Sequence, residues 1–529
     1  MRDVFKSFSV YTLLMLFLVG CATNAVKSPA DMAVSHGYVV GSIHSDMSLG
    51  LTLKSANGKE VFLPADLSLL SAKGVGGWVP AGSYEIVNLI NRSIVGNDVI
   101  SIPKDSLPKI EVKAGHITDI NHLIPVNLGK GKQTVLSIAR KEPITPFIAE
   151  ANPDLFSGKS PISWVAEGEL AESTLKMGGS GQGLIIDWII HAGRRSQQAE
   201  QLDLLSQVKT HEDAFHLIKA YRQPSTALLI DDEGNSYFGT QTGQVRFKKA
   251  ETWEVMDTGY LDAVIALDIR SDGTITVGLD SGKLIQSGDN GKTWNLKNQL
   301  PKNELFFGIK SFPGKQFVAT WIPDANSGVY LSHVGQKINP VVKLYEVQGD
   351  SITEVLQMKG KEAYGCCFRP IFSGTKKSLY LAMPADQIQV YDVESSSGRF
   401  LKLQKPFSGL WVNDEESLMT VWLAGGMFST AFFSDDQGAS WKSLPKPPYQ
   451  PRHIYLDGAQ SGLMWSLAIG LNSASFKLDK LDSAKNTWQE ITKSETDCLH
   501  LLPNFTKREY FCILDNGVIR TYADGKWSE

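Results

Sequence analysis

The sequence predicts a mainly β protein, and features of residues 224–529 lead to that prediction. Alternating strand patterns recur along this segment, and turns that contain glycine separate them. An aromatic residue closes each unit, at intervals of 39 to 55 residues. These residues are Trp253, Trp294, Tyr345, Phe400, Trp441, Trp488 and Trp527. Such a period is typical of a β-propeller, and seven units cover the segment. Six or eight units, or a set of unrelated hairpins, are the alternatives.

Length and composition limit the possible classes of protein. A chain of 529 residues exceeds one typical domain, so we expect two or three domains. A hydrophobic content of 42% and a charged content of 20% are those of an ordinary folded protein. The formal charge of −4 argues against a dedicated nucleic-acid binder, because no basic stripe is present. The 47 glycines and 12 tryptophans fit a β protein rich in turns.

The N-terminus predicts export. Arg2 and Lys6 give a short positive region, and Phe8–Gly20 is mostly apolar. That stretch is too short for a mature membrane-spanning helix, which needs about 20 residues. We therefore expect residues 1–21 to be a signal peptide and residues 22–35 to be a flexible tether.

The end of this segment suggests how the exported chain is held. Leu18-Val19-Gly20-Cys21 resembles the bacterial lipobox, in which the cysteine carries acyl chains such as palmitate and becomes the first residue. The resemblance implies a membrane lipid as a partner through acylated Cys21. Ala22 replaces the aspartate that retains such lipoproteins at the inner membrane, which implies the outer membrane, on its periplasmic or its surface face. An ordinary secretion signal with a chance cysteine is the alternative.

Two regions precede the repeats. Residues 36–140 are expected to form a small β-sandwich, because Tyr38–Ile43 and Leu49–Leu53 alternate and Asn57-Gly58 predicts a hairpin. Val79–Ile86 resembles a strand of the carboxypeptidase-regulatory-like sandwiches. Residues 141–223 read as a short helical linker region, with a buried helix over 184–192 and amphipathic helices over 196–221.

The predicted linker region contains two motifs that resemble ligand sites but lack a required feature of such sites. The glycine-rich stretch 178–183 lacks the G-K-[ST] ending of a phosphate loop, so a hinge is the better interpretation. His211 and His216 are five residues apart, so they do not share one helix face and predict no metal site.

The repeats contain one octapeptide pattern twice. Residues 287–294 and 434–441 both read S-x-D-x-G-x-[ST]-W. The aspartate can accept hydrogen bonds from backbone N–H groups two residues on, and the glycine can take a positive φ. The tryptophan can pack against a neighbouring sheet. We therefore expect a structural role for Ser287, Asp289, Gly291, Thr293, Trp294, Ser434, Asp436, Gly438, Ser440 and Trp441.

This pattern resembles the Asp-box, or BNR repeat, of sialidase-like β-propellers. The resemblance implies a propeller whose boxes lie on outer hairpins, away from any active site. Sialidases also use an F/Y-R-I-P motif before the first box, three arginines and a Tyr–Glu pair. Here Phe368-Arg369-Pro370 lacks the isoleucine and follows the first box. No G-x-S-x-G, H-E-x-x-H or paired carboxylate motif replaces it, so we predict no catalytic residue and no cofactor.

Four cysteines follow Cys21, and an exported compartment permits disulfides. Cys498 and Cys512 are expected to lie opposite each other in the first two strands of the last unit, where they could form a bridge. Cys366 and Cys367 are neighbours on one strand and are expected to be packed thiols, a strained vicinal disulfide being the alternative. No C-x-x-C occurs, so a zinc ribbon is unsupported.

These observations favour a non-catalytic exported lipoprotein whose propeller binds an envelope protein or a glycan. A divergent carbohydrate-active enzyme and an assembly factor for an envelope complex are the alternatives. We expect recognition on the propeller face formed by the loops after the second strand of each unit. Candidate ligand-binding residues are Trp321 and Trp422, near the end of the second strand of their units, Trp411, which begins a neighbouring unit, and Arg369. The alternative for the tryptophans is packing between sheets.

Overall fold

The structure is a computed structural model of the whole chain. The residues it describes are 29–44, 49–64, 74–93, 96–129, 132–140, 158–166, 170, 172–177, 210–218, 224–231, 233–249, 252–301, 304–323, 337–364, 369–384, 387–403, 406–424, 428–459, 461–469, 474–494, 498, 500–504, 507, 509–514 and 519–528. Cys21, Cys366, Cys367, the glycine-rich stretch and the predicted helix over 184–192 lie outside these residues.

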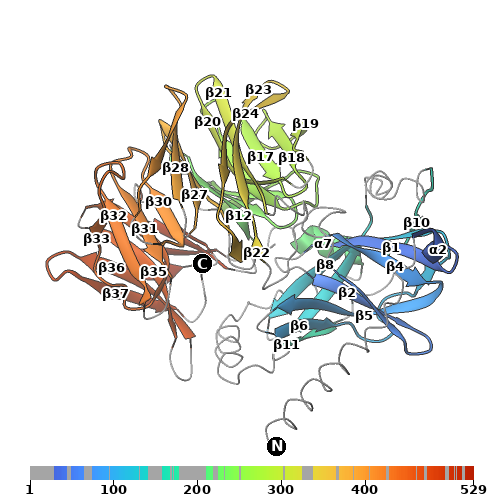
Figure 1. Ribbon diagram of the computed structural model, residues 1–529. Coiled ribbons are helices and arrows are strands. Elements are labelled where there is room, and N and C mark those ends of the chain that lie inside the picture. The colour runs from blue at the N-terminus through green and yellow to red at the C-terminus, as the bar shows by residue number, and fades with distance from the viewer. Residues whose placement is uncertain are drawn as a thin grey trace, which may run out of the picture.

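The N-terminal module is one eleven-stranded sheet that curls around a single hydrophobic core (Figure 1). Leu51 and Leu89 on one part of the sheet share that core with Val39 and Leu123 on the other part. The strand order is β3-β2-β5-β6-β11-β9-β8-β1-β4, with β7 beside β5 and β10 beside β8. The bounds are α2 (Pro29–Ala33), β1 (His36–Ile43), β2 (Leu49–Ser55), β3 (Glu60–Leu63), β4 (Gly74–Pro80), β5 (Gly82–Ser93), β6 (Gly96–Ser101), β7 (Ile110–Val112), β8 (Ile117–Gly129), β9 (Lys132–Ile138), β10 (Ile162–Ser163) and β11 (Glu172–Met177).

The module differs from the sequence expectation at both of its boundaries. The short helix α2 lies within the predicted tether 22–35. Strands β10 and β11 lie within the predicted helical region, and β11 pairs with both β6 and β9. The sheet therefore continues past residue 140. These strands are two and six residues long, and both are separated from the module by more than 20 residues, so local periodicity did not connect them to it.

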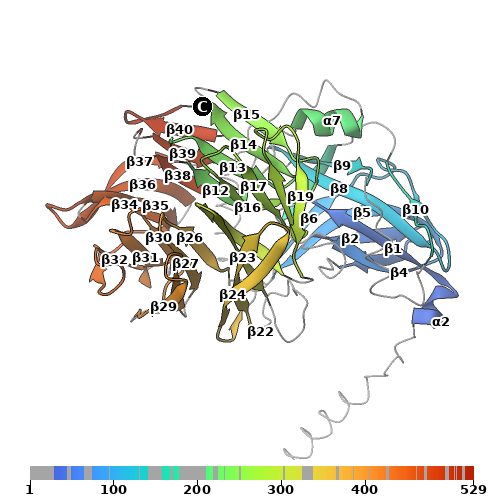
Figure 2. The same cartoon turned by 90° about the horizontal axis from the view of Figure 1, so that it is seen from above.

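One described helix, α7 (His211–Ile218), packs on the module and precedes the repeats. Thr210 caps it, because its hydroxyl oxygen accepts the Asp213 N–H at 3.1 Å. Ala214 and Phe215 pack on apolar residues of β8 and β9. Leu261 of the propeller joins the same cluster, so α7 lies where the two parts of the molecule meet (Figures 1 and 2).

Within the described residues of the repeated segment there are seven four-stranded antiparallel sheets, and the strands of each sheet are paired in chain order, with β22 inserted between the second and third strands of one of them. We number them I to VII in chain order. The strands are β12 (Pro224–Ile230), β13 (Ser236–Thr240), β14 (Gln244–Lys249) and β15 (Thr252–Asp257) in sheet I; β16 (Val264–Ile269), β17 (Ile275–Leu279), β18 (Lys283–Ser287) and β19 (Asn295–Gln299) in sheet II; β20 (Leu305–Phe312), β21 (Lys315–Ile322), β23 (Val341–Gln348) and β24 (Ser351–Lys359) in sheet III; β26 (Ile371–Gly374), β27 (Ser378–Met383), β28 (Gln387–Asp392) and β29 (Ser397–Leu401) in sheet IV; β30 (Gly409–Val412), β31 (Met419–Leu423), β32 (Thr430–Ser434) and β33 (Lys442–Ser443) in sheet V; β34 (Gln450–Gly458), β35 (Ser461–Ile469), β36 (Ala474–Asp482) and β37 (Thr487–Ser494) in sheet VI; and β38 (His500–Asn504), β39 (Glu509–Ile513), β40 (Ile519–Ala523) and β41 (Lys526–Ser528) in sheet VII.

The sheets are arranged as the blades of a β-propeller (Figures 1 and 2). Successive first strands contact one another from β12 through β16, β20, β26 and β30 to β34, so these strands, with β38, are the inner strands. Apolar clusters fill the space between neighbouring sheets. A two-stranded ribbon, β22 (Lys337–Ile338) with β25 (Ala363–Tyr364), is added beside sheet III.

Side chains, rather than a shared strand, join the last sheet to the first. Trp253 of sheet I packs edge-on against Phe511 of sheet VII at 5.8 Å between ring centroids. Lys248 Nζ lies 3.4 Å from a Glu509 carboxylate oxygen. Asn504 Nδ2 donates to the Gly234 carbonyl oxygen at 3.0 Å. Because no described strand is shared between sheet VII and sheet I, these side-chain contacts close the ring.

The aromatic repeat follows the sheets with one exception. Trp253, Phe400, Trp488 and Trp527 lie on fourth strands, and Trp294 and Trp441 immediately precede them. Tyr345 was expected in the same position, but it lies in β23, the third strand of sheet III. The fourth strand β24 has no aromatic residue, so spacing alone selected the wrong one. Among the described residues, no helix is long and apolar enough to cross a bilayer.

Candidate functional site

The two S-x-D-x-G-x-[ST]-W segments form matching turns between the third and fourth strands of sheets II and V. In sheet II, one carboxylate oxygen of Asp289 accepts the N–H groups of Lys292 at 3.1 Å and Thr293 at 2.9 Å. The other oxygen accepts the Thr293 hydroxyl at 2.7 Å. The donors are therefore three and four residues on, rather than two as expected. Ser287 Oγ in turn donates to Asp289 and accepts the Gly291 N–H.

The turn in sheet V repeats this network. Asp436 accepts the Ser440 N–H at 2.8 Å and the Ser440 hydroxyl, and Ser434 Oγ accepts the Gly438 N–H at 2.8 Å. Gly291 and Gly438 have φ values of +78° and +82°, as expected. Trp294 and Trp441 are half-buried and pack on the clusters between sheets. These hydrogen bonds hold the turns of the outer hairpins.

Hydrogen bonding also sets the protonation of both aspartates. The Thr293 backbone and hydroxyl lower the pKa of Asp289 to about 2, and Ser287 adds to the effect. The Ser440 hydroxyl and backbone lower the pKa of Asp436 to about 2 in the same way. Each donor favours the ionised carboxylate, so both turns depend on that form.

The candidate tryptophans occupy different environments. Trp321 and Trp422 are 5% and 6% exposed and belong to apolar clusters between sheets, which is the packing alternative. The expectation that they face a ligand is wrong, because sheets on both sides cover the second strands. Trp411 lies in β30 of sheet V, the same sheet as Trp422 rather than a neighbouring one, and it is only partly buried. Arg369 is exposed just before β26 and is not joined to the other three.

Trp411 instead belongs to a group of aromatic and basic residues on the inner strands of sheets V to VII. Its ring contacts Tyr455 edge-on, with 6.0 Å between centroids. Tyr455 stacks on His453, two residues earlier in β34, at 5.9 Å and an interplanar angle of 11°. The next inner strand begins with His500, and Arg452 precedes His453. We call Trp411, Arg452, His453, Tyr455 and His500 the axial cluster.

The local sequence explains on which side of its sheet each of these side chains lies. In β34, Ile454 and Leu456 are buried between sheets V and VI, so His453 and Tyr455, which alternate with them, point the other way. Trp411, His453, Tyr455 and His500 are all partly exposed. Tyr455 packs on the apolar cluster between sheets VI and VII, and Trp411 packs on the cluster between sheets V and VI.

Burial keeps two members of the axial cluster uncharged. Deep placement in the protein lowers the pKa of His453 to about 3, and the charges of His500 and Arg452 lower it further in that direction. Burial raises the pKa of Tyr455. At neutral pH the cluster therefore presents a neutral imidazole and a neutral phenol next to an arginine.

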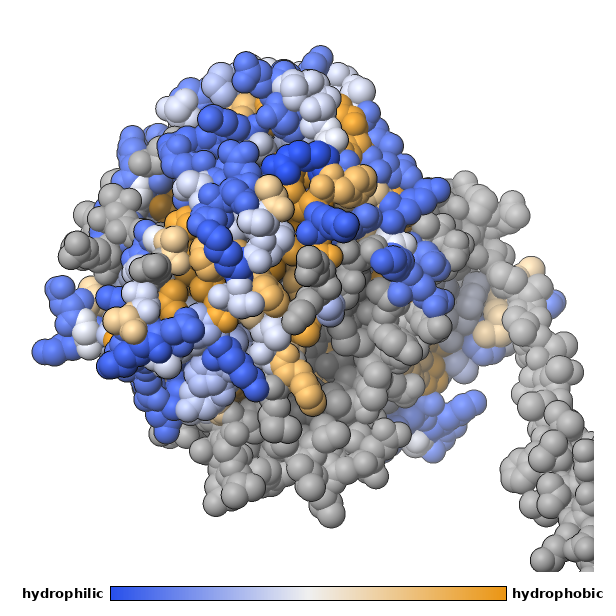
Figure 3. All heavy atoms as spheres, turned by 60° about the vertical axis from the view of Figure 1, so that its left-hand side comes forward, coloured by the Kyte–Doolittle hydropathy of each residue, from blue (hydrophilic) through white to orange (hydrophobic). Residues whose placement is uncertain are grey.

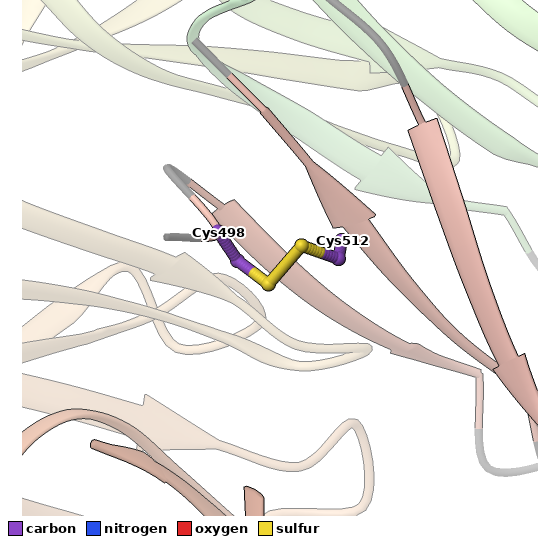
Figure 4. Close-up of a disulfide and its surroundings, with 2 residues drawn as sticks. All are labelled: Cys498 and Cys512. Atoms are coloured by element: carbon purple, nitrogen blue, oxygen red, sulfur yellow. A yellow bond between two sulfur atoms is a disulfide. The ribbon is translucent and has the colours of Figure 1, made fainter. Parts of the chain in front are cut away.

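A disulfide lies beside the cluster. Cys498 and Cys512 form a bridge with Cα atoms 5.0 Å apart (Figure 4), which confirms the expected pairing. Cys498 precedes β38 rather than lying in it, and Cys512 is opposite Leu501. Tyr455 donates its hydroxyl hydrogen to the Leu501 carbonyl oxygen at 2.7 Å. The bridge therefore fixes the segment that carries His500 and anchors Tyr455.

Acidic residues near the inner strands are engaged in structural bonds or lie apart from the cluster. Among the described inner-strand residues, the acids are Asp268 and Asp457. Asp268 is buried and accepts the Ser311 N–H at 2.7 Å, and Asp457 is exposed near the end of β34. Just before β20, the buried Glu304 accepts hydrogen bonds from Lys343 Nζ at 2.8 Å and from the Tyr345 hydroxyl at 3.0 Å.

No three metal-binding side chains come together within the described part of the chain.

Burial raises the pKa of Tyr345 to about 12, and Glu304 adds to it. This group is a buried polar contact between the inner strand and the third strand of sheet III.

Apolar surface also appears near the same blades. The most exposed large apolar residue in the described propeller is Phe428, at 78%, which follows the second strand of sheet V. This is one of the loops expected to form the recognition face. Figure 3 shows apolar residues gathered in the middle of one side of the molecule, within a more hydrophilic rim.

Sequence reasoning missed His453, Tyr455, Arg452 and His500. Their signal was present in Arg452-His453-Ile454-Tyr455-Leu456, where aliphatic residues alternate with a histidine and a tyrosine. That alternation places the histidine and the tyrosine together on one face of the strand. The position of His500 near these residues could not be predicted from the local sequence, because His500 belongs to another sheet.

Comparison with known proteins leaves the family open. No protein-family model matches the chain, and no curated protein matches it in sequence. Solved structures with similar folds include YCF48 bound to D1 peptide, at 12% identity and a TM-score of 0.41, covering 57% of this chain and 94% of that one. An oligogalacturonate lyase from Vibrio parahaemolyticus is similar at 11% identity and a TM-score of 0.43, and the match covers 57% of this chain and 89% of that one. A virginiamycin B lyase from Staphylococcus aureus is similar at 13% identity and a TM-score of 0.37, and the match covers 57% of this chain and 94% of that one. These likenesses concern the fold alone.

Proposed function

We propose that this protein is a lipid-anchored envelope protein whose propeller binds a protein or glycan without transforming it. The observation that carries the binding role is the axial cluster. Tyr455 contacts His453 on its own strand and Trp411 of the adjacent blade, and all three side chains are partly exposed. Aromatic rings that are held by packing make good anchors, because little conformational freedom is lost when a ligand covers them.

The anchoring part of the proposal rests on the lipobox resemblance at Cys21. Expression in a Gram-negative host should give a membrane-bound protein whose mature mass includes acyl chains. Cys21→Ser should yield uncleaved or soluble protein without that mass increase. Unchanged fractionation and unchanged mass of the variant would contradict the anchor.

The binding part is tested with purified protein that lacks residues 1–21. The protein is screened against glycan arrays and used to capture partners from envelope extract. A ligand would support the proposal if Trp411→Leu weakens its binding at least tenfold and Phe400→Leu leaves its binding unchanged. Phe400 is the matched control, because it is an exposed aromatic residue on an outer strand. Turnover of a polysaccharide that is abolished by changing an acidic propeller residue would overturn the non-catalytic role.

A further inference from the structure

Three of the ten histidines in the chain are buried in the part of the N-terminal module on which α7 packs (Figure 2). His44 is 2% exposed, His122 is 9% exposed and His211 is 6% exposed. An imidazole has an ordinary pKa of about 6.5, so its charge changes under mildly acidic conditions. We call His44, His122 and His211 the docking histidines.

The docking histidine of β8 lies on the face of the sheet that receives α7. His122 alternates with Ile124 along β8 and is directly opposite Ile138 of β9. Ile124 and Ile138 both belong to the apolar cluster that α7 and Leu261 of the propeller complete. A change at His122 therefore acts on the surface where the two parts of the molecule meet.

The first two docking histidines share one hydrogen bond. His44 Nε2 and His122 Nδ1 are 2.8 Å apart, with 4.8 Å between the ring centroids. One of these nitrogens carries the hydrogen and the other presents its lone pair, so the bond requires one unprotonated nitrogen. Acid that protonates both rings breaks the bond and places two like charges in a buried site.

The third docking histidine joins α7 to the sheet directly. His211 Nδ1 accepts the Ser137 N–H of β9 at 3.2 Å. Protonation of Nδ1 removes this acceptor and leaves two donors facing each other. Burial lowers the pKa of His211. The undocked helix therefore binds the proton first, and docking weakens as the pH falls below the ordinary value of about 6.5.

A buried ion pair lies close to the histidine pair. Arg140 Nε is 3.1 Å from an Asp119 carboxylate oxygen, and both side chains are more than 90% buried. Arg140 also donates to Ser42 Oγ, and Ser42 is the partner of His122 in the register between β1 and β8. The charge of Asp119 is thus already engaged by Arg140, and the guanidinium opposes further positive charge beside it.

The remaining charged groups of the packed elements face water or other partners. On α7, Glu212, Asp213 and His216 are exposed, where solvent screens their charges. In the propeller, Asp262 follows Leu261 and accepts the Ser281 hydroxyl at 3.0 Å. These positions leave the docking histidines most stable in their uncharged forms.

We infer that the docking histidines make the contact between the N-terminal module and the propeller sensitive to pH, so that protonation releases α7 and undocks the two parts. At neutral pH the uncharged rings hold α7 on β9. This inference concerns the contact within the chain and is independent of the proposed ligand and lipid anchor.

Hydrogen exchange and small-angle scattering between pH 7.5 and pH 5.5 test the inference, using protein that lacks residues 1–21 with a metal chelator present. After correction for the intrinsic rate of exchange, the opening constant of α7 should rise by up to about tenfold per pH unit for each histidine that takes up a proton. The radius of gyration should increase over the same range. Amides of the inner propeller strands should stay protected.

Variants assign the response to the docking histidines. His211→Asn places an amide oxygen near the position of Nδ1, so it keeps the acceptor without titrating, and it should reduce the response. The double variant His44→Gln, His122→Asn replaces the paired rings with amides that can still bond each other, and it should also reduce the response. His216→Gln, at the exposed histidine of the same helix, is the matched control and should keep the full response.

Several outcomes would overturn the inference. One is unchanged α7 exchange and scattering over this pH range, and another is a full response in both amide variants. Loss of protection in α7 together with every strand would show that acid unfolds the whole protein instead. If one amide variant is open at every pH, the response of the other decides. If both are open, the parent decides, and an α7 opening constant that takes up less than one proton would contradict the inference.

Discussion

At the scale of single residues, the S-x-D-x-G-x-[ST]-W turns are the part of the structure that local chemistry determines most completely. Asp289 and Asp436 each bond the backbone and the hydroxyl of a residue four positions on. All the donors come from the same eight residues, so the turn was predictable from the pattern alone. The exact donor position was not, because it depends on the left-handed pair Asn290 and Gly291.

The first prediction concerns the charge of Asp289. Asp289→Asn should lower the melting temperature, because an amide is a weaker acceptor and brings two unwanted donors. Asp350→Asn, at an exposed turn, is the control and should have no effect. The folded-state pKa of about 2 lies below the unfolded value of about 3.9, so the stabilisation is present above pH 4 and is lost as the pH falls toward 2. Melting curves from pH 7 to pH 2 test this. An Asn variant that melts like the parent at every pH would show that the carboxylate is dispensable.

The second prediction concerns His453. Its folded-state pKa of about 3 lies below the unfolded value of about 6.5, so the unfolded state binds the proton first. The free protein should therefore lose stability as the pH falls from 6.5 toward 3. His453→Gln should flatten that part of the stability profile relative to the parent. Denaturant titrations across this pH range measure the effect, and identical slopes in both proteins would contradict the assigned environment.

At the scale of elements, the hairpin that begins sheet VII depends on a covalent link. The Cys498–Cys512 bridge closes a loop of about 15 residues, a length for which chain entropy gives about 3 kcal/mol. We predict that the double variant Cys498→Ser, Cys512→Ser loses about 3 kcal/mol of unfolding free energy. Reductant should destabilise the parent and not the variant. A difference below about 1 kcal/mol would mean that packing alone holds β38.

Another element-scale prediction concerns the turn between β13 and β14. Gly243 has φ +82°, and a Cβ there would lie 1.9 Å from the Tyr260 carbonyl oxygen. The segment it supports carries Leu261 to the helix α7. Gly243→Ala should cost more than the roughly 1–2 kcal/mol of a left-handed alanine. Gly273→Ala, at φ +81° without a close neighbour, is the matched control and should cost only that amount. Equal losses would show that the contact is relieved without strain.

At the scale of the whole molecule, the repeated sheets could be predicted from the sequence, but the contacts between segments far apart in the chain could not. Regular aromatic spacing and glycine turns come from local structure, so sheets I, II and IV to VII were located correctly. Tyr345 was misplaced because β24 has no aromatic residue to mark it. The strand β11 and the axial cluster depend on contacts between segments far apart in the chain, and no local pattern encodes those.

Ring closure provides the next prediction at this scale. Phe511 is 1% exposed and contacts Trp253 and Lys248 of the first sheet. Phe511→Ala should cost roughly 3–5 kcal/mol and should increase amide exchange in both sheet I and sheet VII. Phe400→Ala, on an exposed outer position, should change neither. Faster exchange confined to sheet VII would contradict a closure that depends on these side chains.

The central claim is that ligands are recognised at the axial cluster. Hydroxyl-radical footprinting tests it most directly, because tryptophan, tyrosine and histidine side chains are oxidised in proportion to their exposure. Oxidation of Trp411, His453 and Tyr455 should fall when the ligand found in the screens is bound, while that of Phe400 stays the same. Unchanged oxidation at the cluster, with protection elsewhere on the propeller, would contradict the claim.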